Sequence, residues 1–407
     1  MTTLSSITLP KGFRAAGGTA GLKPSGKPDL ALIVADQPCP WAAVFTQNKV
    51  CGAPVTVGRE HLKTSNFRGR AFVVNSGCSN VATGARGIAN AKRMCDALAR
   101  AIGCDRDQVL PASTGVIGRH LPIDKITAGI NALVPRLARG PHADADAAVA
   151  ILTTDLVAKV AHRTVKIGGK TVTLAGIAKG SGMIAPNMAT MLVFLTTDAD
   201  IAPPLLRRAL IAAVNADASF NRISVDTDTS TSDTVAILAS GYAGNTPIRQ
   251  ANEHFRGFQK ALTDLCTDLA YQVIKDGEGA EHVIRVIVTG AHSDADAVKA
   301  ARTIADSPLV KTAVHGGDPN WGRIAAAAGR SGGGARIDPQ KFTIKVGKIT
   351  VYRNAQPAKF DVKSAAAEMK LPEVVIRVNL NLGKSSATFL GCDLSRQYIA
   401  INADYTT

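Results

Sequence analysis

The stretch Lys179-Gly-Ser-Gly-Met-Ile-Ala-Pro-Asn-Met-Ala-Thr190 is followed at once by Met-Leu-Val-Phe-Leu195, an apolar run that is typical of a buried β-strand. Its two glycines and its proline predict an irregular connection before that strand. Thr190 directly precedes the apolar run and follows the small residue Ala189. It has two interpretations: threonine commonly begins strands, and its hydroxyl can also act as a nucleophile.

The nucleophile interpretation of Thr190 requires a base beside the hydroxyl. The α-amine of the same residue can be that base once the residue is N-terminal, because such an amine titrates at roughly 7.7 to 8. The chain would then have to break between Ala189 and Thr190, a step that the hydroxyl can start by attacking the preceding carbonyl. The upstream glycines and the small Ala189 would let the loop adopt the strained turn that this attack needs.

The apolar pattern on both sides of this stretch predicts strands and helices in a mixed order. Because strict βαβ alternation is missing, we expect an α+β fold of packed layers and not a doubly wound sheet. No linker-like segment divides the chain, so any domains should be closely associated. We expect strands at 29–35, 42–46, 70–75, 163–167, 171–174, 191–196, 234–238, 282–288, 342–346, 349–352 and 374–380, a loop over 109–118, and helices from about 84, over 124–133 and 144–152, after 204, and over 250–274 and 294–305.

The composition is that of a folded, basic protein. The 407 residues are 46% hydrophobic, and 47 Lys and Arg against 32 Asp and Glu give a formal charge of +15, which favours anionic partners. Aromatic residues make up only 4% and the basic residues are scattered, so a nucleic-acid interface is not indicated. The first ten residues do not resemble a secretion signal and no apolar run reaches about 18 residues, so we expect a cytoplasmic protein.

Several other motifs have a structural interpretation. The seven cysteines show neither a CxxC pair nor a Cys/His cluster, so we expect buried free thiols and no metal site. The G-x-S-x-G pattern at 329–333 follows an Ala-rich run and not a strand, which favours a loop over a nucleophile elbow. The acidic-hydroxyl run 225–233 could hold a hard cation or satisfy the backbone of a tight loop. His315 has no evident partner and is interpreted as structural.

The stretch 179–192 closely resembles the self-cleaving site of the ornithine acetyltransferase (glutamate N-acetyltransferase) family of arginine biosynthesis. The resemblance runs through nearly the whole chain. The matching segments are 13–17, 25–34, 73–77, 112–118, 153–155, 225–234, 276–280, 316–324 and 401–407.

The resemblance implies a layered α/β/β/α-type sandwich and a precursor that cuts itself between Ala189 and Thr190. The products would be an α chain (1–189) and a β chain (190–407) that stay together in an α2β2 heterotetramer. Thr190 would accept the acetyl group of N2-acetylornithine and pass it to glutamate in a ping-pong reaction. No cofactor is implied; use of acetyl-CoA as a second acetyl donor, which makes some members multifunctional, stays open.

The resemblance also assigns site residues. Thr114 and Gly115 match the family's oxyanion hole, a hydroxyl and a backbone N–H. The residues that fall where the family binds substrate are Thr153, Lys179, Thr190, Glu278, Asn402 and Thr407, with Thr154 an alternative to Thr153. A lysine such as Lys179 suits an α-carboxylate, whereas Glu278 could meet an ammonium or pair with Lys275.

Some positions depart from the family pattern, among them Cys78, Thr227, Ser232 and the pair 281–282. They put loop geometry and donor selectivity in doubt more than the type of reaction. Two other functions stay open from the sequence: an amidohydrolase or aminopeptidase of similar fold, in which water takes the acyl group, and a non-enzymatic binder of anions.

Overall fold

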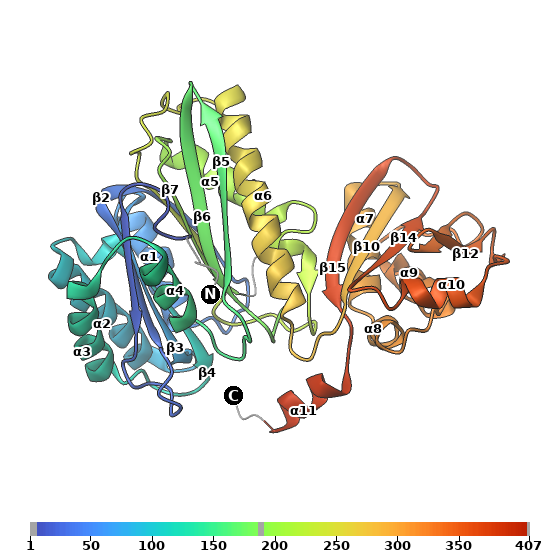
Figure 1. Ribbon diagram of the computed structural model, residues 1–407, viewed down its shortest axis with the longest axis horizontal. Helices are drawn as coiled ribbons and strands as arrows, with labels where there is room; N and C mark the ends of the chain where they lie inside the picture. Colours follow the sequence, from blue (N-terminus) through green and yellow to red (C-terminus); the bar gives the residue numbers. More distant parts are fainter. Residues whose placement is uncertain (1–5, 186–190, 405–407) are drawn as a thin grey trace.

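The computed structural model describes residues 6–185 and 191–404, which form a larger and a smaller lobe (Figure 1). The strands of the larger lobe are β1 (Phe13–Gly18), β2 (Leu30–Phe45), β3 (Arg68–Cys78), β4 (Val109–Val116), β5 (Lys159–Ile167), β6 (Lys170–Lys179), β7 (Leu192–Thr197) and β9 (Thr234–Ala239). Its α-helices are α1 (Ala53–Thr64), α2 (Gly84–Ile102), α3 (Ile123–Leu133), α4 (Pro141–Ala150), α5 (Pro203–Asn215) and α6 (Glu253–Lys275).

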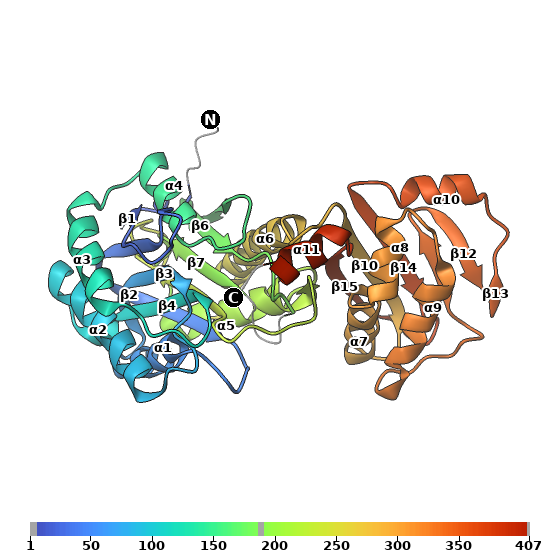
Figure 2. The same cartoon turned by 90° about the horizontal axis from the view of Figure 1, so that it is seen from below.

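The smaller lobe is built on a second sheet. Its strands are β8 (Ile223–Ser224), β10 (Val283–Ala291), β11 (Thr343–Val346), β12 (Ile349–Arg353), β13 (Gln356–Pro357), β14 (Glu373–Asn379) and β15 (Ser385–Cys392), in the order β13-β12-β11-β14-β10-β15-β8. Its α-helices are α7 (Asp294–Ala305), α8 (Pro308–His315), α9 (Trp321–Arg330) and α10 (Val362–Glu368). The last helix, α11 (Arg396–Asp404), leaves this lobe and returns towards the larger one (Figure 2).

The larger lobe has the layered architecture that was expected. Its sheet has the order β4-β3-β2-β9-β7-β6-β5, with β1 also paired to β2. Three apolar clusters fill the spaces between the layers. α2 and α3 pack on the half of the sheet formed by β2, β3 and β4, and this half packs on the half formed by β6, β7 and β9. α5 and α6 cover the outer face of that second half. Phe72 and Phe194, whose ring centroids are 5.2 Å apart, meet between the two halves of the sheet. The α+β sandwich is therefore confirmed.

The larger sheet interleaves strands from both sides of position 189. β7 and β9 lie between β2 and β6. β7 pairs with β6 in antiparallel register, with Leu192 opposite Lys179, and with β9 in parallel register, with Leu192 opposite Thr234. Segments 1–189 and 190–407 thus share one hydrogen-bonded sheet, and their division into two chains stays a prediction.

Two local expectations were wrong. The runs at 29–35 and 42–46 are one long strand, β2, in which the residues around Pro38 and Pro40 are accommodated by a register shift against β3 between Val34 and Cys39. The expected loop at 109–118 contains β4. Pro111 fits there because β4 is an edge strand, in which one missing backbone N–H can be tolerated.

The six helices expected from about 84, over 124–133 and 144–152, after 204, and over 250–274 and 294–305 are all present, with bounds that differ by a few residues. α6 begins after the capping residue Asn252, whose side chain accepts a hydrogen bond from the Phe255 N–H, and it buries one continuous face. The helices α1, α8, α10 and α11 were not predicted. No helix in the described part of the chain combines the length and the apolarity needed to cross a membrane.

Candidate active site

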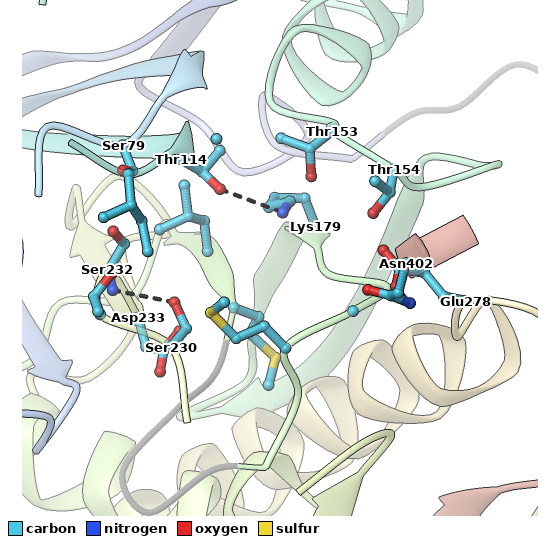
Figure 3. Close-up of a pocket in the computed structure, with 17 residues that line it drawn as sticks. Ser79, Thr114, Thr153, Thr154, Lys179, Ser230, Ser232, Asp233, Glu278 and Asn402 are labelled. Carbon is cyan, nitrogen blue, oxygen red and sulfur yellow. Dashed lines mark hydrogen bonds between the residues drawn. The ribbon is translucent and has the colours of Figure 1, made fainter. Parts of the chain in front are cut away.

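A cavity of about 150 Å³ lies where β4 and β6 end and β7 begins, and where the loop after α6 and helix α11 approach these strands (Figure 3). It brings together all the predicted site residues that the structure describes: Thr114, Gly115, Thr153, Lys179, Glu278 and Asn402. Ala189, Thr190 and Thr407 lie outside the described residues. Met191 and Leu192, which follow Thr190 in the chain, line the cavity.

The predicted oxyanion pair is set by a close approach of two strands. β3 and β4 run parallel with Gly77 opposite Gly115, and both glycines have positive φ angles, +97° and +124°. A Cβ atom on Gly115 would lie 2.5 Å from the carbonyl carbon of Gly77. Only glycine therefore fits beside Thr114 at the cavity wall.

Lys179 ends β6 with its side chain almost fully buried, 10% exposed. Its Nζ donates a hydrogen bond to Thr114 Oγ1 at 3.4 Å, and it lies 3.9 Å from Asp155 Oδ2. Burial lowers the pKa of Lys179, and the nearby Asp155 carboxylate opposes this shift. The site thus holds a poorly solvated cation that a substrate carboxylate can neutralise.

A buried ion cluster ties the walls of the cavity together. Lys159 Nζ donates to Asp155 Oδ1 at 2.6 Å and to Asp276 Oδ2 at 2.5 Å, and none of the three side chains is more than 7% exposed. Asp155 also accepts from the N–H groups of Gly180 at 2.6 Å and Thr153 at 3.0 Å. Burial favours the protonated form of Asp155, but Lys179 and Lys159 hold its pKa well below its usual range.

Glu278 and Asn402 form the opposite wall. Asn402 Nδ2 donates to Glu278 Oε2 at 2.9 Å, which joins α11 to the loop after α6. The Glu278 N–H donates to the carbonyl of Ser181 at 3.0 Å. A Cβ on Gly182 would overlap the Glu278 carboxylate, so this glycine makes room for it. The alternative ion pair with Lys275 is not found among the described residues, although α6 does extend to Lys275.

Asp155, Lys159 and Asp276 were not predicted as a site cluster. The spacing of four residues between Asp155 and Lys159 could have indicated their ion pair. Asp276, the third member of the cluster, is more than one hundred residues away along the chain, so the sequence does not place it there. Thr153 and Thr154 both line the cavity, so the choice between them stays a prediction (Figure 3).

Asp233 also lines the cavity and was not predicted to be a site residue by itself. Burial raises the pKa of its carboxyl well above the usual value. Its Oδ2 has no hydrogen-bond partner within the described part of the chain.

The motifs set aside from the sequence have structural roles in the part of the chain that is described. His315 does have a partner, contrary to expectation: its Nδ1 lies 2.9 Å from Oδ2 of the buried Asp393, 78 residues away. The 329–333 pattern caps the end of α9 and does not follow a strand. The described cysteines are free, and no cluster of three or more acidic, His or Cys side chains in the described ranges could hold a metal.

Comparison with known proteins gives matches along almost the whole chain. The ArgJ family matches residues 14–407. The arginine biosynthesis bifunctional protein ArgJ of Geobacillus stearothermophilus is 45% identical over 99% of this chain and 96% of its own length. The solved arginine biosynthesis bifunctional protein of Bacillus halodurans is 43% identical, with a TM-score of 0.50 over 52% of this chain and 98% of that chain. The ornithine acetyltransferase of Mycobacterium tuberculosis, solved with ornithine, is 39% identical, with a TM-score of 0.41 over 46% of this chain and 97% of that chain.

The ion cluster predicts a specific stability pattern. Lys159→Met leaves Asp155 and Asp276 buried without their shared cation, so the free energy of unfolding should fall by about 3–5 kcal/mol. Lys159→Met/Asp276→Asn should recover part of this loss, because Asp155 keeps Lys179 nearby.

Denaturant titration of the single, double and wild-type proteins measures this pattern. The control is Arg163→Met, which breaks an ion pair with Asp268 that is about 40% exposed and should cost at most about 1 kcal/mol. If Lys159→Met is no more costly than Arg163→Met, the cluster does not hold the walls together.

Proposed function

The chain belongs to the ArgJ family, and on that basis we propose that it transfers the acetyl group of N2-acetylornithine to glutamate, yielding ornithine and N-acetylglutamate in arginine biosynthesis. The observation that carries this proposal is the cavity at the start of β7. Its walls hold Thr114 and Gly115, the cation of Lys179 and the carboxylate of Glu278. Thr190 lies two residues before the first residue of β7.

The first step is self-cleavage. Thr190 Oγ attacks the carbonyl carbon of Ala189, the C–N bond breaks, and the Ala189 acyl group moves from nitrogen to oxygen. Water then hydrolyses this ester, which leaves a carboxylate on Ala189 and a free hydroxyl and α-amine on Thr190. One residue now carries both the nucleophile and its base.

Acetyl transfer follows from that pair. Thr190 Oγ attacks the acetyl carbonyl of N2-acetylornithine while the α-amine takes the hydroxyl proton. The Thr114 hydroxyl and the Gly115 N–H stabilise the tetrahedral oxyanion; one such donor typically contributes about 2.7–4 kcal/mol. The C–N bond of the donor breaks, the α-amine returns the proton to the departing amine, and glutamate later takes the acetyl group by the reverse chemistry.

Charge complementarity supports the substrate assignment. Both acetyl carriers have an α-carboxylate, for which Lys179 is a buried partner with its charge only partly compensated. Glu278, held by Asn402, suits the side-chain ammonium of ornithine. Thr153 and Thr407 complete the proposed contacts.

The mature assembly is proposed to be α2β2 and cytoplasmic. The polypeptide of the Bacillus halodurans structure matches only about half of this chain while being almost fully covered itself. A chain cut near position 189 would give a piece of that size. The interleaved sheet would keep the two pieces together.

Neither alternative function is favoured. The relatives that match over nearly their full length are named as arginine biosynthesis proteins, which does not support an amidohydrolase or a non-enzymatic anion binder. Their names include the word bifunctional, and we propose acetylation of glutamate by acetyl-CoA as the second activity. A cleft of about 870 Å³ adjoins the site at Gly115 and Thr153, and Lys27 and Arg119 on its walls can meet phosphates.

The proposal predicts two fragments in the intact mass spectrum, the second beginning at Thr190 and gaining one acetyl group with N2-acetylornithine. Thr190→Ala should remain one uncut and inactive chain, because it has lost the hydroxyl. Glutamate should accelerate release of ornithine and become acetylated. Efficient cutting by the alanine variant would remove Thr190 from the mechanism, and release of free acetate without transfer would favour the amidohydrolase.

The lowered pKa of Lys179 predicts the pH dependence of substrate binding. As the pH rises through this pKa, below the usual value of about 10.4, the cation is lost and KM for N2-acetylornithine should increase. Lys179→Arg keeps its charge over the same range, so its KM should change less with pH. At neutral pH its KM should be higher than that of the wild type, because a planar guanidinium does not replace the compact lysine ammonium. Steady-state kinetics between about pH 7 and 10 test this; parallel profiles for both proteins would exclude Lys179 as the carboxylate partner.

The second activity predicts release of free CoA thiol and formation of N-acetylglutamate from acetyl-CoA and glutamate alone. Lys27→Glu/Arg119→Glu should raise KM for acetyl-CoA about tenfold or more by placing negative charge beside its phosphates, while KM for N2-acetylornithine stays unchanged. Lys363→Glu, on the exposed surface of α10, is the control. An enzyme that releases no thiol has only the first activity.

A further inference from the structure

The acidic-hydroxyl run 225–233 forms a loop before β9, and its side chains bind a different segment of the chain. Asp226 accepts hydrogen bonds from two successive backbone N–H groups, from Met183 to Oδ2 at 2.6 Å and from Ile184 to Oδ1 at 2.8 Å. Both oxygens of this carboxylate are therefore used outside the loop. The loop also satisfies part of its own backbone, one of the two roles considered for it, since the Asp228 N–H donates to Asp226 Oδ1 at 3.3 Å.

Further contacts fix the same segment. The Val225 N–H donates to the Ile184 carbonyl at 2.7 Å, and Thr229 Oγ1 donates to the Ala185 carbonyl at 2.8 Å. Ile184 and Thr229 also form an isolated β-bridge. Met183 has a φ of +55°, a left-handed conformation that a non-glycine residue keeps only when its surroundings hold it. The loop thus sets the path of the chain up to Ala185.

The strand that directly follows the loop binds the chain beyond the predicted cleavage point. The N–H of Thr234, the first residue of β9, donates to the Met191 carbonyl at 2.9 Å, and Thr234 lies opposite Leu192 in the β7–β9 pair. The loop and the start of β9 therefore hold the described residues on both sides of 186–190, the segment that contains Ala189 and Thr190.

The loop itself is anchored to the residues after β2. Thr46 Oγ1 donates to the Ser230 carbonyl at 2.7 Å, and Asn48 Nδ2 donates to the Thr229 carbonyl at 3.0 Å. The Gly52 N–H donates to the Thr231 carbonyl at 2.8 Å. These contacts connect the loop to the larger sheet, so it can act as a rigid support.

We propose that the 225–233 loop, with Thr234 at the start of β9, is the frame for self-cleavage and that Asp226 is its principal positioning residue. The loop fixes residues 183–185 and Thr234 fixes residues 191–192, so the two described ends of the chain on either side of the proposed cleavage point are held in place. Attack within a chain depends steeply on such placement, and a misplacement of about 1 Å can cost about a hundredfold in rate. This inference rests on the proposed self-cleavage and adds no reactant to it, since water remains the only molecule consumed.

Asp226→Asn is a sharp test because the amide has one acceptor oxygen and one donor group. The Met183 and Ile184 N–H groups point to different oxygens of Asp226, so in the same side-chain position the amide accepts from only one of them and its NH2 group faces the other. Asp228→Asn is the matched control: it removes the same charge two residues away, from an exposed side chain that does not bind the 183–185 segment.

The experiment follows the cut fraction with time by intact mass spectrometry after cell-free synthesis of the full-length chain. We expect the half-time of cutting to rise about tenfold or more for Asp226→Asn and to change less than about twofold for Asp228→Asn. Equal half-times for the two variants would overturn the proposal. If the wild type itself stays uncut, the proposed self-cleavage fails; if wild type and Asp226→Asn are both cut promptly, only the frame fails.

A second pair of variants tests the proposal even if Asp226→Asn folds poorly. A lowered melting temperature of Asp226→Asn would reveal such a folding defect. Thr229→Val removes only the hydroxyl that binds the Ala185 carbonyl and should slow cutting about threefold or more, whereas Thr227→Val alters an exposed neighbour and should not. Equal half-times for this pair would also count against the frame.

Hydroxylamine distinguishes the step that is affected, because it cleaves an ester but not an amide. If Asp226 positions the attack, hydroxylamine should not rescue Asp226→Asn, since the ester forms too rarely. Rapid rescue would place the defect in hydrolysis of the ester and contradict a positioning role.

Discussion

Four charges buried at the meeting point of three chain segments are the constraint on which the site depends. Lys159 and Lys179 face Asp155 and Asp276, so the net charge of the group is close to zero although it is almost completely removed from water. Each carboxylate also accepts backbone N–H groups, which satisfies oxygens that would otherwise be costly to bury. The cluster therefore both holds the walls in place and leaves one cation, Lys179, at the cavity.

Glycines complete this arrangement at two points where a side chain would collide with the site. Gly115 lets β4 approach β3 closely enough to place Thr114 at the wall, and Gly182 leaves space for Glu278. Polar contacts and tight backbone packing thus act together: the ion cluster fixes the distances between the walls, and the glycines determine which groups can reach the cavity.

Much of this could be predicted from the sequence. Apolar periodicity indicated α6 and most strands of both sheets, and family motifs indicated six of the residues that meet at the cavity. Other features could not be predicted, because they depend on contacts between residues that are far apart in the chain. Pro111 led to the prediction of a loop, because the sequence does not show that this residue lies on an edge strand, where proline is tolerated. α11 buries none of its residues fully and therefore shows no strong apolar stripe; its bond from Asn402 to Glu278 spans 124 positions. The partner of His315 likewise lies far along the chain.

The interleaving of β7 and β9 between β2 and β6 has a consequence for the order of events in the life of the molecule. Neither piece contains a complete larger sheet, so separately made halves would each expose unpaired strand edges. Folding of the continuous backbone avoids these exposed edges, because both segments are present when the sheet forms. Under the proposed cleavage at 189, a reactive terminal amine would then arise in a molecule whose larger sheet is already complete.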